Sequence, residues 1–342
     1  MIGEQLSTLV AGLGLGRRYV APVEDGMAVV VTDTVARPAD GDDAADVVDV
    51  LRALTDWTPQ TFTATVRTGG GLTADAEVRF PSPRPQGEPA CDAVLLDWHA
   101  ARDPAGARVE AGGGAPSVLV LDILHGENMV SAFVGRVLSA CGVNAFVMHM
   151  PRNARRRPAP GPYDWRHFLP SLRQAIADAR RARDVIAALP GITGPVAIQG
   201  TSLGGFVTAA AAGIDRAFDP VVIALAGGDV YRVLCDGQVD AARVRLRLTE
   251  AGLTDEQLRG ELWASDPLRV AHRLDPARTW MFTARRDQVV PAAQSDALAA
   301  RIGLGPSHHV KIGGCHYTCV VNAPKVIADV ARIIKGEEGA VS

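Results

Sequence analysis

Ser202 is the residue of this sequence whose surroundings most favour nucleophilic chemistry. It lies at the centre of a Gly-x-Ser-x-Gly motif, with Gly200 and Gly204 on either side. An apolar run precedes the motif, and small residues with a helical pattern follow it over 207–212. A strand, one sharp turn and a helix in this order predict a nucleophile elbow, which lifts the hydroxyl clear of the sheet. The alternative interpretation is a Gly/Ser loop that merely connects a strand to a helix.

Glycine fits both flanking positions of such a turn. A side chain at position 200 or 204 would collide where the helix doubles back on the strand, and glycine has none. The same geometry directs the first N–H groups of the helix at the space in front of Ser202, where they favour negative charge. The motif therefore predicts a reactive serine beside an anion-stabilising site.

A nucleophilic serine needs a base, and His316 is the candidate. A free hydroxyl is hardly ionised at neutral pH, and the base in turn needs a group that holds its tautomer. His316 follows the last expected strand in a glycine-containing loop that can reach back toward Ser202. His308 and His309 are alternatives, but they stand at the start of that strand, the wrong end for the site. A plain surface histidine is the remaining alternative.

The candidate acid is Asp287, which comes just after the expected strand 279–284. Catalytic groups gather at the carboxyl ends of parallel strands, and the expected chain order is serine, acid, histidine. Asp229, after the expected strand 220–226, is the alternative acid. Either aspartate can instead be a loop carboxylate that caps the next helix. We favour Asp287 because the residues around it fit the family motif described below.

Acyl chemistry also needs two N–H donors for an oxyanion. The backbone N–H of Leu203, the residue after the nucleophile, is the first candidate. The second is the N–H of Glu127, with Gly126 as the alternative, in the loop after the expected strand 117–123. His125 in the same loop is interpreted as structural. The loop can also be a plain turn without a catalytic part.

The elements that must position these groups begin after Pro116, where strands and helices alternate. This alternation predicts a mostly parallel sheet covered by helices on both faces. Besides the strands already named, we expect a strand at 144–150 and one at 309–312, and helices at 131–141, 172–189, 292–301 and 324–334. The polar, helical segment 229–277 is a candidate lid insertion.

The earlier part of the chain reads differently. Residues 61–98 predict antiparallel strands that open the sheet of a main domain spanning 61–342. Residues 1–60 predict an N-terminal extension packed on that domain, with a helical pattern over 42–57 and a β-branched run over 29–32. The role of this extension stays open.

Five pieces of the sequence resemble the α/β-hydrolase superfamily, in its serine esterase-like branch, and occur in the family's order between about 120 and 320. They are Leu124-His125-Gly126, Gly200-Thr201-Ser202-Leu203-Gly204-Gly205, Asp266-Pro267, Arg286-Asp287-Gln288-Val289-Val290-Pro291 and Gly313-Gly314-Cys315-His316-Tyr317. The resemblance implies a mostly parallel eight-stranded sheet and hydrolysis of esters or related acyl compounds through an acyl-enzyme. Serine at the nucleophile position disfavours the dienelactone hydrolases, which carry cysteine there, and the dehalogenases and epoxide hydrolases, which carry aspartate.

Aromatic residues in two segments are candidates for the substrate pocket. Tyr163, Trp165 and Phe168 follow the loop after the strand 144–150, and Tyr231 and Trp263 lie in the candidate lid. The alternative is that these rings simply anchor surface helices on the core. The sequence leaves the substrate itself open.

The bulk composition excludes several classes of function. The 342 residues carry a net charge of −3, which predicts neither a nucleic-acid partner nor binding to an anionic membrane surface. No apolar run approaches a membrane span, and Glu4 interrupts any apolar core of a leader, so we expect a cytoplasmic protein. The cluster Arg152, Arg155, Arg156 and Arg157 is expected to be a solvated loop, with an anionic substrate as the alternative.

The cysteines indicate neither disulfides nor a metal. Five cysteines at scattered spacings do not form a disulfide framework, and reduced thiols are expected. Cys315 and Cys319 flank His316, but structural tetrahedral sites need four ligands, so no metal is expected. No cofactor is expected either, and the sequence does not determine the oligomeric state.

Together these observations predict a serine hydrolase that acts on a small acyl substrate through Ser202, His316 and Asp287. An acyltransferase, a thioesterase or a peptidase would use the same three residues, and the elbow does not separate them. A non-catalytic binding protein on a hydrolase scaffold is a further alternative, which the order of the three residues disfavours.

Overall fold

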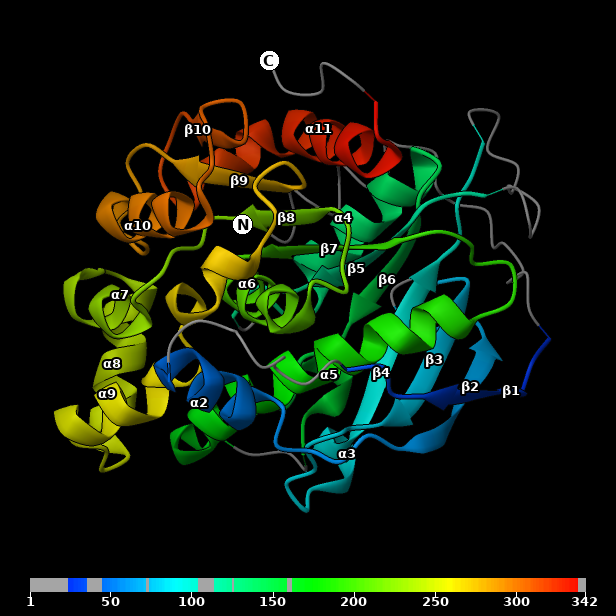
Figure 1. The fold of residues 1–342 in the computed structure, drawn as a ribbon, viewed down its shortest axis with the longest axis horizontal. Coiled ribbons are helices and arrows are strands. Elements are labelled where there is room, and N and C mark those ends of the chain that lie inside the picture. The colour runs from blue at the N-terminus through cyan, green and yellow to red at the C-terminus, as the bar shows by residue number, and fades with distance from the viewer. Residues whose placement is uncertain are drawn as a thin grey trace.

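The structure, a computed structural model, describes residues 24–35, 45–71, 74–103, 114–124, 126–158 and 162–337. These residues form one ten-stranded sheet with the strand order β1-β2-β3-β4-β6-β5-β7-β8-β9-β10 (Figure 1). The strands are β1 (Met27–Thr32), β2 (Thr61–Thr68), β3 (Ala76–Pro81), β4 (Ala93–His99), β5 (Ser117–Leu121), β6 (Asn144–Met148), β7 (Val196–Thr201), β8 (Val221–Ala224), β9 (Thr279–Ala284) and β10 (His309–Ile312).

Two kinds of pairing divide this sheet. Strands β1 to β4 pair antiparallel in succession, and β4 also pairs antiparallel with β6. The remaining pairs, from β6 through β5, β7, β8 and β9 to β10, are parallel. The mostly parallel α/β architecture is therefore confirmed, but the sheet has ten strands where the family resemblance implied eight.

The N-terminal segment accounts for part of this difference. The β-branched run of β1 pairs antiparallel with β2, so it forms the edge of the main sheet. Helix α2 (Ala45–Leu54) buries Val50 and Leu51 completely and contacts α5 (Phe168–Ala188). The described parts of the predicted extension thus add one strand and one helix to the main domain.

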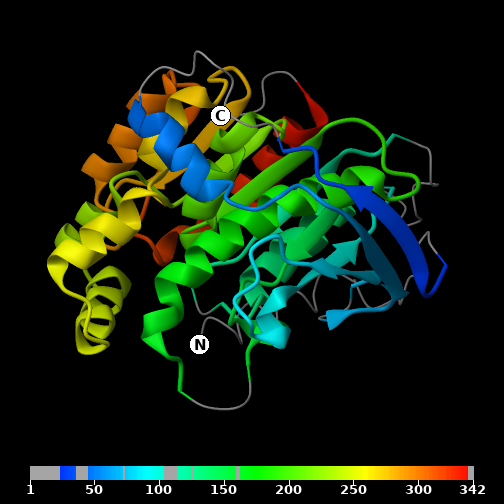
Figure 2. The same ribbon diagram turned by 60° about the horizontal axis from the view of Figure 1, so that its bottom comes forward.

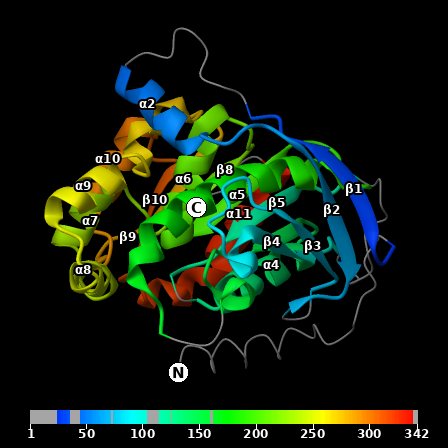
Figure 3. The ribbon, with the colours of Figure 1, turned by 90° about the horizontal axis from the view of Figure 1, so that it is seen from below.

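Helices cover both faces of the sheet (Figures 2 and 3). On one face α4 (Met129–Ala140) and α11 (Ala323–Lys335) share an apolar core cluster with the strands. On the other face α5, α6 (Leu203–Asp215) and α10 (Ala292–Ile302) contribute to a second, larger cluster. The short α3 (Pro89–Asp92) precedes β4. Within the described ranges no helix is long and apolar enough to cross a membrane.

The segment predicted as a lid is helical. It contains α7 (Val230–Asp236), α8 (Asp240–Glu250) and α9 (Asp255–Trp263), and we call residues 229–277 the cap segment. The three helices gather at one end of the molecule, on the left in Figure 1, while β1 lies at the opposite end. Motion of the cap segment as a lid stays a prediction.

Buried ion pairs join α5 to the N-terminal edge of the sheet. Arg181 bonds Asp33 at 2.5 Å, with side chains 1% and 3% exposed. Its neighbour Arg180 bonds Asp184 at 3.0 Å and Asp215 at 2.7 Å. Because charges withdrawn from water need close partners, the Arg181–Asp33 pair restricts how the antiparallel edge lies against α5, whereas the pairs of Arg180 lie within α5 and between α5 and α6.

The arginine-rich segment after β6 is not the solvated loop that the sequence favoured. Arg156 is completely buried, where it bonds Asp178 at 2.7 Å and donates to the carbonyl oxygen of His149 at 3.0 Å. Arg155 and Arg157 remain partly exposed and are also ion-paired. The sequence did not reveal this because the carboxylate partners lie far away along the chain.

Candidate active site

The backbone around Ser202 has the strained geometry that the motif predicts. Ser202 has φ 53° and ψ −117°, outside the regions that L-residues prefer. A Cβ atom at Gly200 would overlap the carbonyl of Gly204, and one at Gly204 would lie 2.5 Å from the carbonyl oxygen of Leu121. Only glycine therefore allows α6 to approach β7 and β5 this closely.

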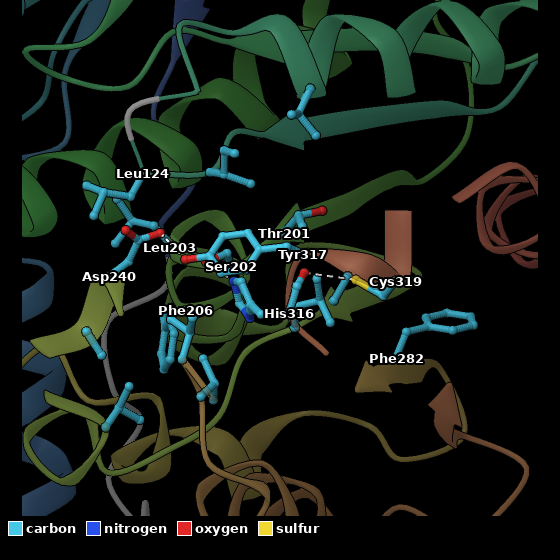
Figure 4. Close-up of a pocket in the computed structure, with 18 of the residues that line it drawn as sticks. Leu124, Thr201, Ser202, Leu203, Phe206, Asp240, Phe282, His316, Tyr317 and Cys319 are labelled. Atoms are coloured by element: carbon cyan, nitrogen blue, oxygen red, sulfur yellow. Dashed lines mark hydrogen bonds between the residues drawn. The ribbon is translucent and has the colours of Figure 1, made fainter. Parts of the chain in front are cut away.

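His316 connects Ser202 to Asp287. His316 Nε2 lies 3.0 Å from Ser202 Oγ, and His316 Nδ1 lies 2.8 Å from Asp287 Oδ2. The side chains of His316 and Asp287 are 8% and 4% exposed. With Nδ1–H donating to the carboxylate, Nε2 is the nitrogen that can accept the serine proton. Figure 4 shows His316 beside Ser202 in the cavity.

The other oxygen of Asp287 is held by the backbone. Oδ1 accepts hydrogen bonds from the N–H groups of Val289 and Val290, both at 2.9 Å. These bonds fix the carboxylate in the loop after β9 and leave Oδ2 for His316. The chemistry that the arrangement supports is proton transfer between Ser202 and a histidine of fixed orientation.

The rival candidates have other partners. Asp229 caps α7 by accepting from the N–H of Arg232 at 3.1 Å. His309 Nε2 bonds Thr283 Oγ1 at 3.0 Å, and His308 Nδ1 bonds the adjacent Ser307 at 3.0 Å. The structure therefore brings neither of these histidines nor Asp229 into hydrogen-bond contact with Ser202.

The loop after β5 is organised by Asp122, which the sequence reasoning missed. This carboxylate is 1% exposed and accepts from the N–H groups of Asn128 at 2.7 Å and Ser131 at 3.3 Å. Burial raises the pKa of Asp122, and its backbone hydrogen bonds oppose that rise. Asp122 directly follows a buried strand and precedes a turn, and this position was the sequence signal that could have identified it.

The two candidates for the second oxyanion donor differ in their bonding. The N–H of Gly126 donates to the carbonyl oxygen of Ile123 at 3.3 Å. Glu127 has φ 48°, and its N–H has no acceptor within the part of the chain that the structure describes. Leu203 is the first residue of α6, directly after Ser202. His125 lies outside the described residues.

An apolar cavity of about 260 Å³ opens at Ser202. The cap helices α7 and α8 contribute Val233 and Val244 to its wall, and α4 and α11 contribute Phe133 and Ile327. Because both helical layers line it, the cavity extends to both sides of the serine. Figure 4 shows this arrangement, with Asp240 and Phe206 on one side of His316 and Phe282 and Cys319 on the other.

Of the five aromatic residues proposed for the pocket, only Phe168 lines this cavity. Tyr163 lines a smaller adjoining cavity, and Trp165 packs against Tyr163 and Phe168 with ring centroids 5.1 and 5.7 Å away. Tyr231 lies under the guanidinium of Arg259 and donates to Asp255. The ring centroid of Trp263 lies 5.5 Å from the guanidinium carbon of Arg269. Three of the five rings, those of Trp165, Tyr231 and Trp263, thus line neither cavity, because the sequence pattern does not show which face of a helix meets the cavity.

Two further residues of the wall connect the histidine loop to its surroundings. The hydroxyl of Tyr317 donates to Asp240 Oδ2 of α8 at 2.6 Å, which joins this loop to the cap segment. Cys319 Sγ donates to the carbonyl oxygen of His316 at 3.0 Å, and burial raises the pKa of this thiol to about 12. The Cys319 thiol therefore stays protonated and supports the loop.

All five cysteines, which lie in the described residues, are free thiols. Across the described ranges, no group of three histidine, cysteine or acidic side chains is placed to hold a metal ion.

No protein-family model matches the chain, and no curated protein matches it in sequence. Solved structures do resemble it. The acetyl xylan esterase from Paenibacillus sp. R4 is 15% identical with a TM-score of 0.62, over 88% of this chain and 96% of that one. Acetyl Xylan Esterase 1 from Thermoanaerobacterium sp. JW/SL YS485 is 15% identical with a TM-score of 0.61, over the same shares. The alpha/beta hydrolase GrgF from Penicillium sp. sh18 is 13% identical with a TM-score of 0.54, over 76% of this chain and 98% of that one.

Proposed function

We propose that this chain, which has the α/β-hydrolase fold of these structures, is a serine hydrolase that cleaves a carboxylic ester through an acyl-enzyme. The observation that carries the proposal is the hydrogen-bonded series Ser202–His316–Asp287 at an apolar cavity. The names of the two esterases with this fold agree with the proposal, although the likeness itself establishes only the fold.

In the first half-reaction, His316 Nε2 takes the proton of Ser202 as Oγ attacks the ester carbonyl. Asp287 stabilises the resulting imidazolium through Nδ1–H. The N–H groups of Leu203 and Glu127 hold the oxyanion of the tetrahedral intermediate. His316 then gives its proton to the departing alkoxide, which leaves as the alcohol with the acyl group bound to Ser202.

In the second half-reaction, water replaces Ser202 as the nucleophile and Ser202 Oγ becomes the leaving group. His316 takes a proton from water as the water attacks the acyl-enzyme carbonyl, and the same N–H groups hold the second oxyanion. Collapse of this intermediate breaks the bond to Ser202 Oγ, which regains the proton from His316. The acid is released, and the side chains return to their starting protonation states.

The wall of the cavity favours an ester with apolar substituents. A peptide substrate needs partners for its backbone N–H and C=O groups, and aliphatic side chains such as Val233 and Val244 offer none. An acyltransferase or thioesterase would share the acyl-enzyme, and product analysis with competing alcohol acceptors separates transfer from hydrolysis. A binding protein without catalysis would not need the strained turn at Ser202.

The test is the variant Ser202→Ala, assayed with p-nitrophenyl butyrate. We expect kcat/KM to fall by at least about 10⁴-fold, because the nucleophile is lost. The matched control is Ser307→Ala, whose exposed hydroxyl bonds only His308 in the described structure. A fluorophosphonate probe should label the parent protein and the control but not Ser202→Ala. A folded Ser202→Ala variant that retains its turnover contradicts the proposal.

A further inference from the structure

Among the described residues, one arginine next to the active site has no charged partner within ion-pair distance. Of the four arginines after β6, three are ion-paired: Arg155 with Glu77 and Asp97, Arg156 with Asp178, and Arg157 with Glu127. Arg152 has no carboxylate within ion-pair distance in the described parts of the chain. Its Nε is buried and has no hydrogen-bond acceptor there. A buried donor left without an acceptor is costly, so a ligand that supplies one would be stabilised.

Arg152 lines a second, smaller cavity that adjoins the first. This cavity has a volume of about 40 Å³, and its polar wall also includes Asn153, Tyr163 and Ser171. It shares Ile123, Leu124, Phe168, Leu172 and Leu203 with the cavity at Ser202. At roughly 30 Å³ for a water-sized group, it accommodates one small polar group at the end of a longer molecule.

The neighbouring titratable groups do not neutralise Arg152. Burial raises the pKa of Tyr163 to about 12, so its phenol stays uncharged. Burial likewise raises the pKa of the Cys91 thiol, although Arg152 opposes that rise. Among the described residues, neither of these groups therefore supplies Arg152 with an anionic partner.

The backbone at this place is strained. Arg152 has φ 60° and Ala154 has φ 44°, in the left-handed region that residues with a Cβ atom rarely adopt. Such conformations persist where the surrounding structure imposes them, and they gather at ligand sites. The strain and the unpaired guanidinium are independent observations on one segment.

We propose that Arg152 binds a carboxylate carried by the substrate, so that the esters cleaved here have an apolar body and an acidic end. A guanidinium binds a carboxylate through two parallel hydrogen bonds, a geometry that a neutral group does not match. The inference rests on the proposed function for the bond that is cleaved. The binding of an acidic group by Arg152 does not itself need catalysis.

The kinetic test compares acidic and neutral esters of equal length. The acidic probes are the mono-p-nitrophenyl esters of adipic, pimelic and suberic acid, and the neutral probes are p-nitrophenyl hexanoate, heptanoate and octanoate. For the best acidic probe, we expect Arg152→Gln to raise KM by about tenfold or more, while neutral esters change by less than about twofold. Arg152→Lys keeps the charge and should restore part of the preference, which a merely structural role would not predict.

The matched control is Arg166→Gln, in the neighbouring segment. Arg166 is 71% exposed and bonds the partly exposed Asp164. We expect neither class of ester to be affected. Equal losses for acidic and neutral esters in Arg152→Gln, or no loss at any chain length, overturn the inference.

A binding experiment separates this inference from the proposed reaction. In Ser202→Ala, calorimetry with monomethyl adipate and monomethyl suberate should show binding that a second change, Arg152→Gln, weakens by about tenfold. If the parent protein cleaves no ester but this binding is observed, the proposed reaction is contradicted and the proposed carboxylate site is supported. If esters are cleaved but binding and KM do not depend on Arg152, the carboxylate site is wrong and the reaction stands.

Discussion

The two oxygens of Asp287 have separate tasks. Oδ1 is held by two backbone N–H groups, and Oδ2 faces His316 Nδ1. In Asp287→Asn, an amide group that faces Nδ1 with its NH₂ favours the tautomer whose Nε2 carries the proton. Such a histidine cannot accept the proton of Ser202, so we predict that kcat/KM for p-nitrophenyl butyrate falls by roughly 10⁴-fold. Steady-state kinetics on the folded variant check this prediction.

The matched control for that prediction is Asp229→Asn. Asp229 is the alternative acid, and in the structure it caps α7. Asparagine caps a helix about as well as aspartate does, so kcat/KM should change little. If Asp229→Asn rather than Asp287→Asn abolishes turnover, the acid has been assigned to the wrong residue.

The positions of these catalytic candidates were predictable because chain order determines which strand each one follows. Ser202, Asp287 and His316 follow β7, β9 and β10, three parallel strands whose carboxyl ends meet at one edge of the sheet. The wall of the pocket was not predictable in this way. Whether a ring such as Trp263 faces the cavity depends on how its helix is rotated against the core, which sequence spacing alone leaves undetermined.

The elbow depends on contact between backbone atoms of three elements. Gly204, in the first turn of α6, lies against the carbonyl groups of Leu121 and Asp122 at the end of β5. A methyl group there must push these carbonyls away. We therefore predict that Gly204→Ala lowers the free energy of unfolding by about 2 kcal/mol or more. It should also reduce kcat/KM of the folded fraction, because the N–H of Leu203 moves with the turn.

Gly260 provides the matched control. It lies in the interior of α9, and a Cβ atom there meets nothing within 4 Å. Alanine in a helix interior is more favourable than glycine by roughly 0.5–1 kcal/mol, so Gly260→Ala should be neutral or stabilising. Urea denaturation measures both variants. A Gly204→Ala protein as stable and active as the parent would show that the turn tolerates a side chain.

The loop between β5 and α4 shows what a local motif leaves out. The His-Gly pair and the position after β5 indicated a donor loop, but they did not show that the carboxylate of Asp122 holds this loop through hydrogen bonds. A buried carboxylate is identified by its partners, and here those are backbone N–H groups six and nine residues further on. Local sequence patterns predict elements and turns well, and they predict such polar support poorly.

The same limit applies to the molecule as a whole. The switch from antiparallel to parallel pairing was visible in the sequence, whereas the attachment of β1 to α5 was not. That attachment uses Asp33 and Arg181, which are 148 residues apart in the chain and form a buried pair. A prediction from sequence places charged residues on the surface, because it does not show which distant residue will become their partner in the fold.

The buried pair leads to a prediction about stability far from the active site. Asp33 accepts two hydrogen bonds from Arg181 and one from the backbone N–H of Gln60. In Asp33→Ala, the guanidinium of Arg181 stays buried without its carboxylate. We predict a loss of about 3–5 kcal/mol in the free energy of unfolding, with kcat of the folded protein unchanged. Urea denaturation and the ester assay measure the two quantities.

A second variant shows whether that loss comes from the unpaired charge. Adding Arg181→Met to Asp33→Ala removes the buried cation and keeps much of the side-chain volume, so the double variant should be more stable than Asp33→Ala alone.

The exposed pair of Arg52 and Asp49, with side chains 73% and 61% exposed, is the comparison. Because exposed pairs contribute only about 0–1 kcal/mol, Asp49→Ala should have little effect. Equal losses of unfolding free energy in Asp33→Ala and Asp49→Ala would mean that the Asp33–Arg181 pair does not stabilise the contact between the N-terminal strand and α5.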